Sequence, residues 1–153
     1  TGLHLVNVSY GSARISEHAD RIAEVIGERA PDARLLVLET ASRLIGADEN
    51  ANGTMAALIA ALERIVERLP TAGIVLVHHV AKEAARSALL DAHVGRGGGA
   101  LADNARSVLT LARVSRDSRD IEIPAAATPL DIQQGRLVVM RHAKSSYAPR
   151  APD

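Results

Sequence analysis

Residues 34–52 read RLLVLETASRLIGADENAN. The apolar run at residues 35–38 is too short for a helix, and its apolar residues are continuous rather than alternating. This pattern predicts a strand that is buried on both faces of a parallel sheet. The run ends on an acid and a hydroxyl, Glu39 and Thr40, and ligands of open α/β sheets bind at the carboxyl ends of strands. Glu39 is therefore a candidate functional residue; the alternative is that it only ends the strand.

Alternating strands and helices are predicted on both sides of this stretch. Residues 3–8 have strand character and precede a turn at residues 9–12. Ser16 is a candidate N-cap of a helix that reaches about Arg29, and a second amphipathic helix occupies residues 55–69 before Pro70. Residues 74–77 form another apolar run. The order strand, helix, strand, helix, strand indicates an α/β fold with a doubly wound, mostly parallel sheet.

The segment after residue 80 has a different character. A helical turn is predicted near residues 84–90 and a mobile loop at the glycine cluster of residues 95–99, followed by a short helix at residues 101–105. Short runs at residues 107–114, 119–124 and 136–142 predict an antiparallel extension of the sheet. We expect residues 1–147 to form one domain, and the two prolines of residues 148–153 predict a disordered tail.

The composition argues against several classes of protein. The 153 residues contain 18 basic and 18 acidic side chains, so no overall field attracts the chain to nucleic acid or to a membrane. Cysteine is absent, which excludes disulfides, thiolate catalysis and cysteine metal sites. No signal peptide is visible, and no apolar run approaches the roughly 20 residues that cross a bilayer. We therefore expect a cytoplasmic protein without a membrane partner.

Two histidines, His78 and His79, directly follow the apolar run of residues 74–77. Adjacent residues of a strand point to opposite faces, so both cannot ligate one metal ion without distortion, and a zinc site is disfavoured. We predict that one histidine contacts a ligand while the other is structural. The glycines around Arg96 lack the pattern of a phosphate cradle and are interpreted as a flexible linker, from which Arg96 can reach an anion on a neighbouring molecule.

Several short motifs, taken in order, resemble one known family. They are LLVLETASRL at residues 35–44, DENANG at 48–53, IVLVHHVAK at 74–82, GRGGGALADNARSVL at 95–109 and AKSSYAP at 143–149. Together they look like the hexameric RecA-like ATPases of the RepA plasmid replicative helicase type. The resemblance covers most of the chain. It implies a RecA-like ATPase core that binds ATP and Mg²⁺, assembles with copies of itself into a ring, and translocates on single-stranded DNA.

The resemblance assigns roles to the ends of two strands. Glu39 matches the acid of the Walker B strand, which holds Mg²⁺ through water, and Glu39 with Thr40 is the expected contact of the nucleotide. The family usually has aspartate at this position, so the extra methylene of Glu39 moves the carboxylate outward. The pair His78 and His79 matches a motif that senses the γ-phosphate, without indicating which of the two is the sensor.

The remaining assignments concern contacts with other subunits and with DNA. Arg96 and Lys144 match residues that act in trans on the ATP of a neighbouring subunit. Tyr147 lies where the resemblance places a contact with the nucleotide base. Lys82 and Arg86 belong to the segment that corresponds to a loop that lines the central channel and binds single-stranded DNA.

The P-loop of that family lies upstream of the first strand seen here. Residues 1–153 contain no G-x-x-x-x-G-K-[ST] pattern. Since a P-loop supplies backbone N–H groups and a lysine to the phosphates, the chain alone is predicted to be inactive. It begins with Thr1 rather than Met, so we expect it to be the C-terminal portion of an ATPase domain, which lacks the P-loop unit.

Two interpretations from other classes stay open. The first is a non-catalytic assembly module that joins other subunits and hydrolyses nothing, which the glutamate at position 39 and the missing P-loop favour. The second is a small-molecule enzyme on a doubly wound sheet. For the second interpretation the sequence offers no nucleophile in a suitable context and no dinucleotide-binding fingerprint.

Overall fold

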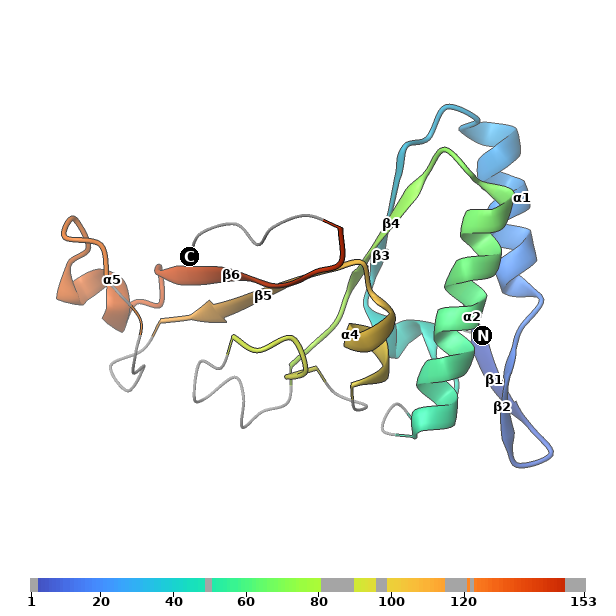
Figure 1. The fold of residues 1–153 in the computed structure, drawn as a ribbon, viewed down its shortest axis with the longest axis horizontal. Helices are drawn as coiled ribbons and strands as arrows, with labels where there is room; N and C mark the ends of the chain where they lie inside the picture. The colour runs from blue at the N-terminus through green and yellow to red at the C-terminus, as the bar shows by residue number, and fades with distance from the viewer. Residues whose placement is uncertain are drawn as a thin grey trace. The chain divides into compact units, whose positions relative to one another are not determined.

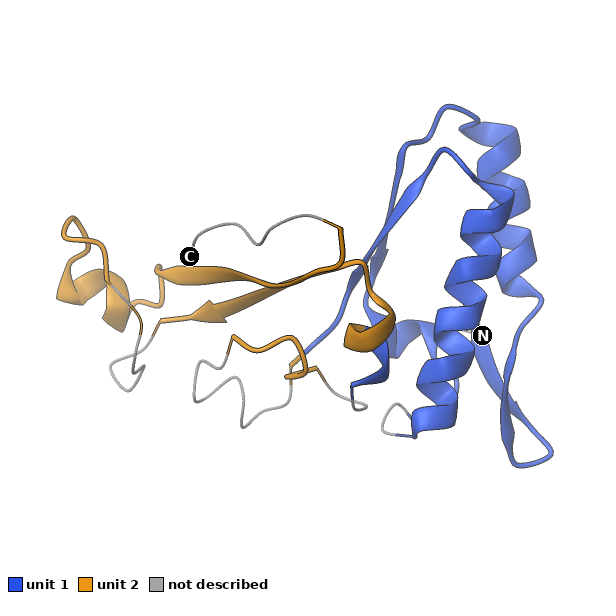
Figure 2. Cartoon of the chain, viewed as in Figure 1, with its two compact units in different colours: residues 1–79, 96–101 blue, residues 80–95, 102–153 orange. Residues whose placement is uncertain are grey.

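The computed structural model describes residues 3–48, 51–80, 90–95, 99–114, 121 and 123–147. The chain divides into two compact units, one of residues 1–79 with 96–101 and one of residues 80–95 with 102–153 (Figure 2). Among the described residues, no helix is both long enough and apolar enough to cross a membrane. The expectation of one domain over residues 1–147 stays a prediction.

The first unit begins with a β-hairpin. Strand β1 (Val6–Ser9) pairs antiparallel with β2 (Ser12–Ile15), and the turn between them has Tyr10 at φ 50° and Gly11 at φ 73°. Two successive residues with positive φ characterise the tight turn whose twist matches that of paired strands. The turn at residues 9–12 was expected, but the return strand β2 was not.

Two helices cover one face of a parallel strand pair. Helix α1 (His18–Arg29) and helix α2 (Asn52–Arg68) lie side by side (Figure 1). They confirm the two predicted helices. The Ser16 hydroxyl accepts a hydrogen bond from the backbone N–H of His18 at 3.2 Å, while Glu17 occupies the N-cap position of α1. On the outer side, Asp20 of α1 pairs with Arg64 at 2.6 Å and with Arg68 at 3.1 Å on α2.

The parallel pair consists of β3 (Leu35–Glu39) and β4 (Gly73–Val77). The inward residues Leu36, Leu38, Ile74 and Leu76 pack against the core. The alternate residues are exposed: Leu35 by 59 %, Val37 by 57 %, Val75 by 46 % and Val77 by 38 %. The expectation that β3 is buried on both faces is therefore wrong, because no described residue covers the second face.

The core of this unit lies between the hairpin, the two helices and the inner face of β3 and β4. Its largest fully buried side chains are Leu5, Val6, Met55, Leu58 and Ile65. Burying each such side chain stabilises the fold by about 1.5–3 kcal/mol. The apolar stripe predicted for residues 55–69 supplies three of these five, which explains why the helical spacing placed α2 correctly.

The second unit contains an antiparallel pair. Strand β5 (Ser107–Arg113) pairs with β6 (Val138–Ser145), with a bulge between Val108 and Leu109. This confirms two of the three predicted C-terminal strands. In the third, at 119–124, the described residues 121, 123 and 124 belong to no strand, and the others lie outside the described residues.

Two short helices accompany this pair along the chain. Helix α4 (Ala100–Asn104), whose first two residues belong to the first unit, agrees with the predicted helix at 101–105. Helix α5 (Pro129–Gln133) was not predicted; Thr128 and Asp131 cap each other's backbone N–H groups at its start. The predicted helical turn and glycine loop lie largely, and the predicted tail entirely, outside the described residues.

The structure is thus a mixed α/β fold. Each sheet formed by the described residues has two strands, and only β3 and β4 are parallel. The doubly wound, mostly parallel sheet stays a prediction. The described residues contain one parallel pair of it, β3 and β4.

Candidate functional site

Strands β3 and β4 end at the same edge of the parallel pair. Glu39 is the last residue of β3 and lies opposite Val77, the last residue of β4, so the two histidines begin one residue past Glu39 in the register. Glu39 is exposed and is joined to Thr40 by a cis peptide bond. The strand ends therefore bring the predicted acid and the predicted histidine pair to one edge, as sequence reasoning expected.

The chain turns sharply after Glu39. Thr40 is buried, and its hydroxyl lies 3.0 Å from that of Ser42. Its carbonyl oxygen accepts a hydrogen bond from the Arg43 backbone N–H at 2.9 Å, which starts the one-turn 3-10 helix η1 (Ala41–Leu44). The Thr40 hydroxyl is thus engaged within the turn, and its role as a nucleotide contact stays a prediction.

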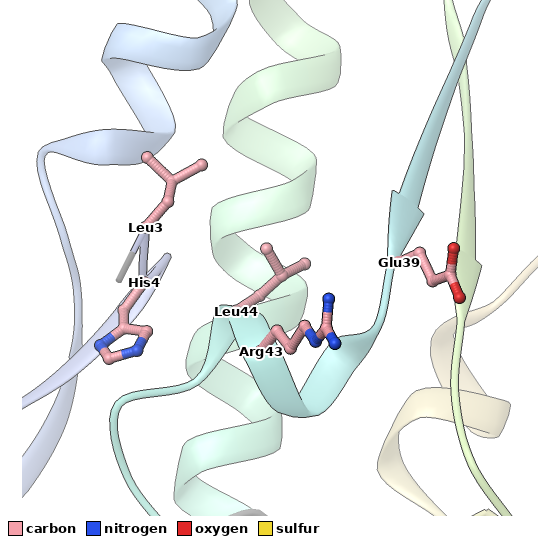
Figure 3. Close-up of a pocket in the computed structure, with 5 residues that line it drawn as sticks. All are labelled: Leu3, His4, Glu39, Arg43 and Leu44. Atoms are coloured by element: carbon pink, nitrogen blue, oxygen red, sulfur yellow. The ribbon is translucent and has the colours of Figure 1, made fainter. Parts of the chain in front are cut away.

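A hollow of about 450 Å³ opens beside this turn (Figure 3). Its lining consists of Leu3, His4, Glu39, Arg43 and Leu44. Two backbone hydrogen bonds join the walls: the Leu5 N–H donates to the Leu44 carbonyl at 2.7 Å, and the Gly46 N–H donates to the Val6 carbonyl at 2.8 Å. These bonds hold the residues before β1 against the end of η1, although the two segments are distant in the sequence.

Three ionisable side chains line this hollow. Within the described part of the chain, neither Glu39 nor Arg43 takes part in an ion pair, and the ring of His4 has no hydrogen bond. In Figure 3 the Glu39 carboxylate points away from the other four residues, whereas Arg43 projects from η1 towards the end of β3. The charges of Glu39 and Arg43 are therefore available to a ligand.

The two histidines differ in exposure. His78 is half-buried, with its Nδ1 atom shielded from solvent, whereas His79 is exposed. This difference agrees with the expectation that adjacent residues face opposite sides. Among the described residues no group of three His, Asp or Glu side chains is placed to hold a metal ion. The roles of both histidines at a γ-phosphate stay predictions.

Two predicted site residues lie in the second unit, where both contact their own chain. The Lys144 ammonium donates hydrogen bonds to the carbonyl oxygens of Ala102 at 2.8 Å and Asp103 at 2.6 Å. The Tyr147 ring is exposed, and the Arg106 guanidinium carbon lies 5.1 Å from its centroid. The trans role of Lys144 and the base contact of Tyr147 stay predictions.

Three further predicted residues, Arg96, Lys82 and Arg86, lie outside the described residues. Conversely, His4 and Arg43 line the hollow but were not singled out from the sequence. No periodic signal marked Arg43, because Glu39 ends a strand, Thr40 is extended, and only residues 41–44 are helical. His4 carried no signal either.

Comparison with known families places the chain. A family model described as an AAA domain matches residues 2–85, more than half of the sequence. The chain belongs to the AAA domain family. The matched stretch of this AAA domain contains the parallel pair, Glu39, both histidines and the whole hollow. Membership implies nucleotide binding and an ATPase-type function. No curated protein and no solved structure gave a significant match.

Proposed function

We propose that this AAA domain is the C-terminal portion of a RecA-like ring ATPase, a DNA helicase or replication motor of the RepA type. It couples ATP hydrolysis to translocation on single-stranded DNA. The observation that carries the proposal is the placement of Glu39, an exposed acid without an ion pair to any described residue, at the end of a parallel strand whose neighbour is followed directly by His78 and His79. The family match supports the ATPase class.

The chemistry of Glu39 suits the cofactor that the proposal requires. Mg²⁺ prefers oxygen ligands and is commonly held by one or two carboxylates, water and substrate phosphates rather than by an all-protein cage. An exposed carboxylate that forms no ion pair with a described residue fits this arrangement, and the lack of a three-ligand cluster in the same part of the chain is compatible with it. When bound, the ion would neutralise charge on the phosphates.

Each predicted site residue would then have a separate role in ATP hydrolysis. Glu39 orients water at the strand end, and one of the two histidines reports the state of the γ-phosphate to the rest of the chain. Arg96 supplies a guanidinium to charge that develops on the transferred phosphoryl group of a neighbouring subunit. The β- and γ-phosphates need a P-loop cradle, which residues 1–153 do not contain, so the proposal places that cradle elsewhere in the assembled protein.

The primary test measures ATPase activity of the protein with its P-loop. We expect Glu39→Gln to lower the turnover rate by about a hundredfold or more, because it removes the charge but keeps the shape, and we expect Glu39→Asp to retain activity. Asp32→Asn is the control, since Asp32 is an exposed acid of the same unit without an ion pair in the described residues. Full activity of Glu39→Gln would refute the proposed role.

The non-catalytic interpretation is the second candidate, and the glutamate in place of aspartate favours it. It predicts that the protein with its P-loop binds nucleotide and assembles with copies of itself but hydrolyses no ATP. An active wild-type protein excludes this interpretation. An inactive wild-type protein that still forms rings establishes it.

The trans role of Arg96 is tested by mixing subunits. Arg96→Ala subunits and subunits with a disabled P-loop should each be inactive alone. In mixed rings, an Arg96→Ala subunit provides the P-loop and its neighbour provides the arginine, so about a quarter of the interfaces become complete at an equal ratio. Mixing should therefore restore activity. If Arg96 acts within its own subunit, mixing restores none.

The DNA contact is tested by the salt dependence of binding. If Lys82 and Arg86 contact phosphates, replacing both with alanine should weaken binding of single-stranded DNA equally for all sequences. Each lost contact should reduce the slope of log affinity against log salt by roughly 0.7. An unchanged affinity and slope would place the two residues away from the DNA.

A further inference from the structure

We propose that one face of the β5 and β6 pair is a docking surface for an acidic amphipathic helix of a partner protein. The two strands run side by side (Figure 1), and alternate residues of each strand point to opposite faces. The face in question, called the β5–β6 face below, consists of three cross-strand pairs: Leu109 with His142, Leu111 with Met140, and Arg113 with Val138.

The β5–β6 face is apolar and exposed, whereas the opposite face is covered within its own unit. The four apolar side chains of the β5–β6 face are each between 55 % and 60 % exposed. On the opposite face Thr110 and Ala112 are buried, and the Thr110 hydroxyl donates a hydrogen bond to the Asp91 carbonyl at 3.2 Å. Contiguous exposed apolar patches mark interaction sites on soluble domains. The strand pair therefore has one packed face and one face that can receive a partner.

The charge of the β5–β6 face selects the partner. Neither strand contains an acidic residue, and within the described residues Arg113 forms no ion pair. A Cβ atom on Gly135, whose φ is 62°, would lie 2.7 Å from Arg113 Cδ and 3.1 Å from its Nε. Glycine at this turn thus lets the backbone lie against the arginine, beside the Val138 end of the face. An arginine in this position needs a carboxylate that its own strands do not supply.

The dimensions of the β5–β6 face match one helix. Two paired strands are about 10 Å wide, and an α-helix with its side chains is about 10–12 Å across. The distance along β5 from Leu109 to Arg113 is about 13 Å, which is the length of about nine helical residues. A helix that lies along the strands can therefore place apolar side chains on Leu109 and Leu111 and a carboxylate, about two turns away, beside Arg113.

Charge favours such a partner over a second copy of this chain. Two copies stacked through the β5–β6 face would bring no carboxylate to Arg113, because neither strand contains an acid. A helix with glutamates beside its apolar stripe supplies the missing group. The inference does not depend on the proposed ATPase function, since the face lies outside residues 2–85, which the AAA family model matches.

The test uses the two methionines of the 153-residue chain as reporters. Their methyl groups are labelled with ¹³C and followed by NMR, and the loss of one signal in Met140→Leu assigns it. Met140 lies on the β5–β6 face, whereas Met55 is fully buried in the core of the first unit and serves as the internal reference. The probe is a synthetic helical peptide of about 16 residues, long enough to form a helix in water, with leucines on one side and glutamates on the other. A matched peptide has lysine in place of every glutamate.

We expect the glutamate peptide to shift the Met140 signal in a saturable manner and to bind more tightly than the lysine peptide. Leu111→Gln should weaken binding of the glutamate peptide about five- to tenfold, because a half-exposed leucine is no longer covered. Arg113→Gln should weaken it roughly two- to fivefold and should not weaken binding of the lysine peptide. Leu35→Gln is the matched control, since Leu35 is exposed to nearly the same degree on β3 and should leave binding unchanged. The amide signals of β5 and β6 verify that each variant keeps the strand pair.

Three results would overturn the proposal. The first is the absence of a saturable Met140 shift, or equal binding of the two peptides. The second is equal weakening by Leu35→Gln and Leu111→Gln, which would mean that the peptide adheres to any exposed leucine. The third is a Met140 shift that depends on protein concentration without peptide and accompanies a doubled mass in sedimentation, because a second copy then occupies the face.

Discussion

Substitution of Lys144 can distinguish a structural role of this side chain from a role in contacts between subunits. Its ammonium donates to two carbonyl oxygens in the last turn of α4, at 2.8 Å on Ala102 and 2.6 Å on Asp103. Carbonyl groups at a helix C-terminus have no partner within the helix, so a lysine that binds them stabilises the helix end. Replacing Lys144 with methionine removes both hydrogen bonds and the charge while keeping a chain of similar length.

The magnitude of this effect follows from the two contacts. A hydrogen bond to a charged group contributes about 1.5–3 kcal/mol when it is well shielded. One of the two contacts is exposed, and exposed charges typically contribute less than about 1 kcal/mol. We therefore expect Lys144→Met to lower the free energy of unfolding by about 1–2 kcal/mol, and Lys144→Arg by less than half of that.

The assay is urea denaturation followed by far-ultraviolet circular dichroism, combined with hydrogen exchange of the α4 amides. Arg136→Gln is the comparison variant, because it breaks a partly exposed ion pair of 3.4 Å with Asp131 in the same unit and should cost less than about 1 kcal/mol. If Lys144→Met matches the wild type in stability and in α4 exchange, the reasoning is refuted. The ammonium is then free to act on another subunit.

Three further predictions follow from particular contacts. Asp20→Asn should lower the free energy of unfolding of the first unit by about 0.5–1.5 kcal/mol in low salt, since Asp20 binds two arginines at the surface. The loss should be smaller in 1 M salt, because salt screens surface ion pairs. Equal losses at both salt concentrations would contradict this explanation. Two hydrogen bonds from Thr128 hold the pKa of Asp131 below its ordinary value. The hydrogen bond of the side chain has the larger effect, and that of the backbone N–H has the smaller one. The capping contribution to α5 is therefore complete above the ordinary carboxyl pKa and is lost as the pH falls through the lowered one, and Thr128→Ala should raise the pKa of Asp131 in an NMR titration. If the pKa of Asp131 is unchanged in this variant, the threonine hydroxyl is not the main cause of the lowered pKa. Leu58→Ala should cost about 3–5 kcal/mol in urea denaturation, because Leu58 is fully buried at the centre of the core; a loss below 1 kcal/mol would mean that the core closes over the gap.

Hydrophobic spacing located most of the helices and strands. The stripe of Met55, Leu58 and Ile65 recurs at helical spacing, and the structure buries all three completely. Strand β2 was missed because Ser12 and Arg14 are polar, exposed residues, and only pairing across the Tyr10–Gly11 turn makes the segment a strand. Helix α5 was missed although Thr128, Pro129 and Asp131 form a recognisable helix start.

The site was predictable only in part. Glu39 and the histidine pair were recognisable because each follows an apolar run, and parallel pairing then places them at one edge. A continuous apolar run does not reveal what covers its second face, which explains the error over the burial of β3. The hollow that His4 and Arg43 both line depends on backbone hydrogen bonds between distant segments, which leave no periodic signal in the sequence.

The two tyrosines determine how this protein can be observed in solution. The sequence contains no Trp and no Phe, so Tyr10 and Tyr147 are its only aromatic chromophores apart from histidine. Tyr10 is 99 % exposed at the hairpin turn and Tyr147 is 77 % exposed. Because both phenol rings are already largely hydrated, their absorbance and emission should hardly change when the chain unfolds. Tyrosine fluorescence is better suited to binding experiments, because the emission of Tyr10 should change when a partner contacts the hairpin turn.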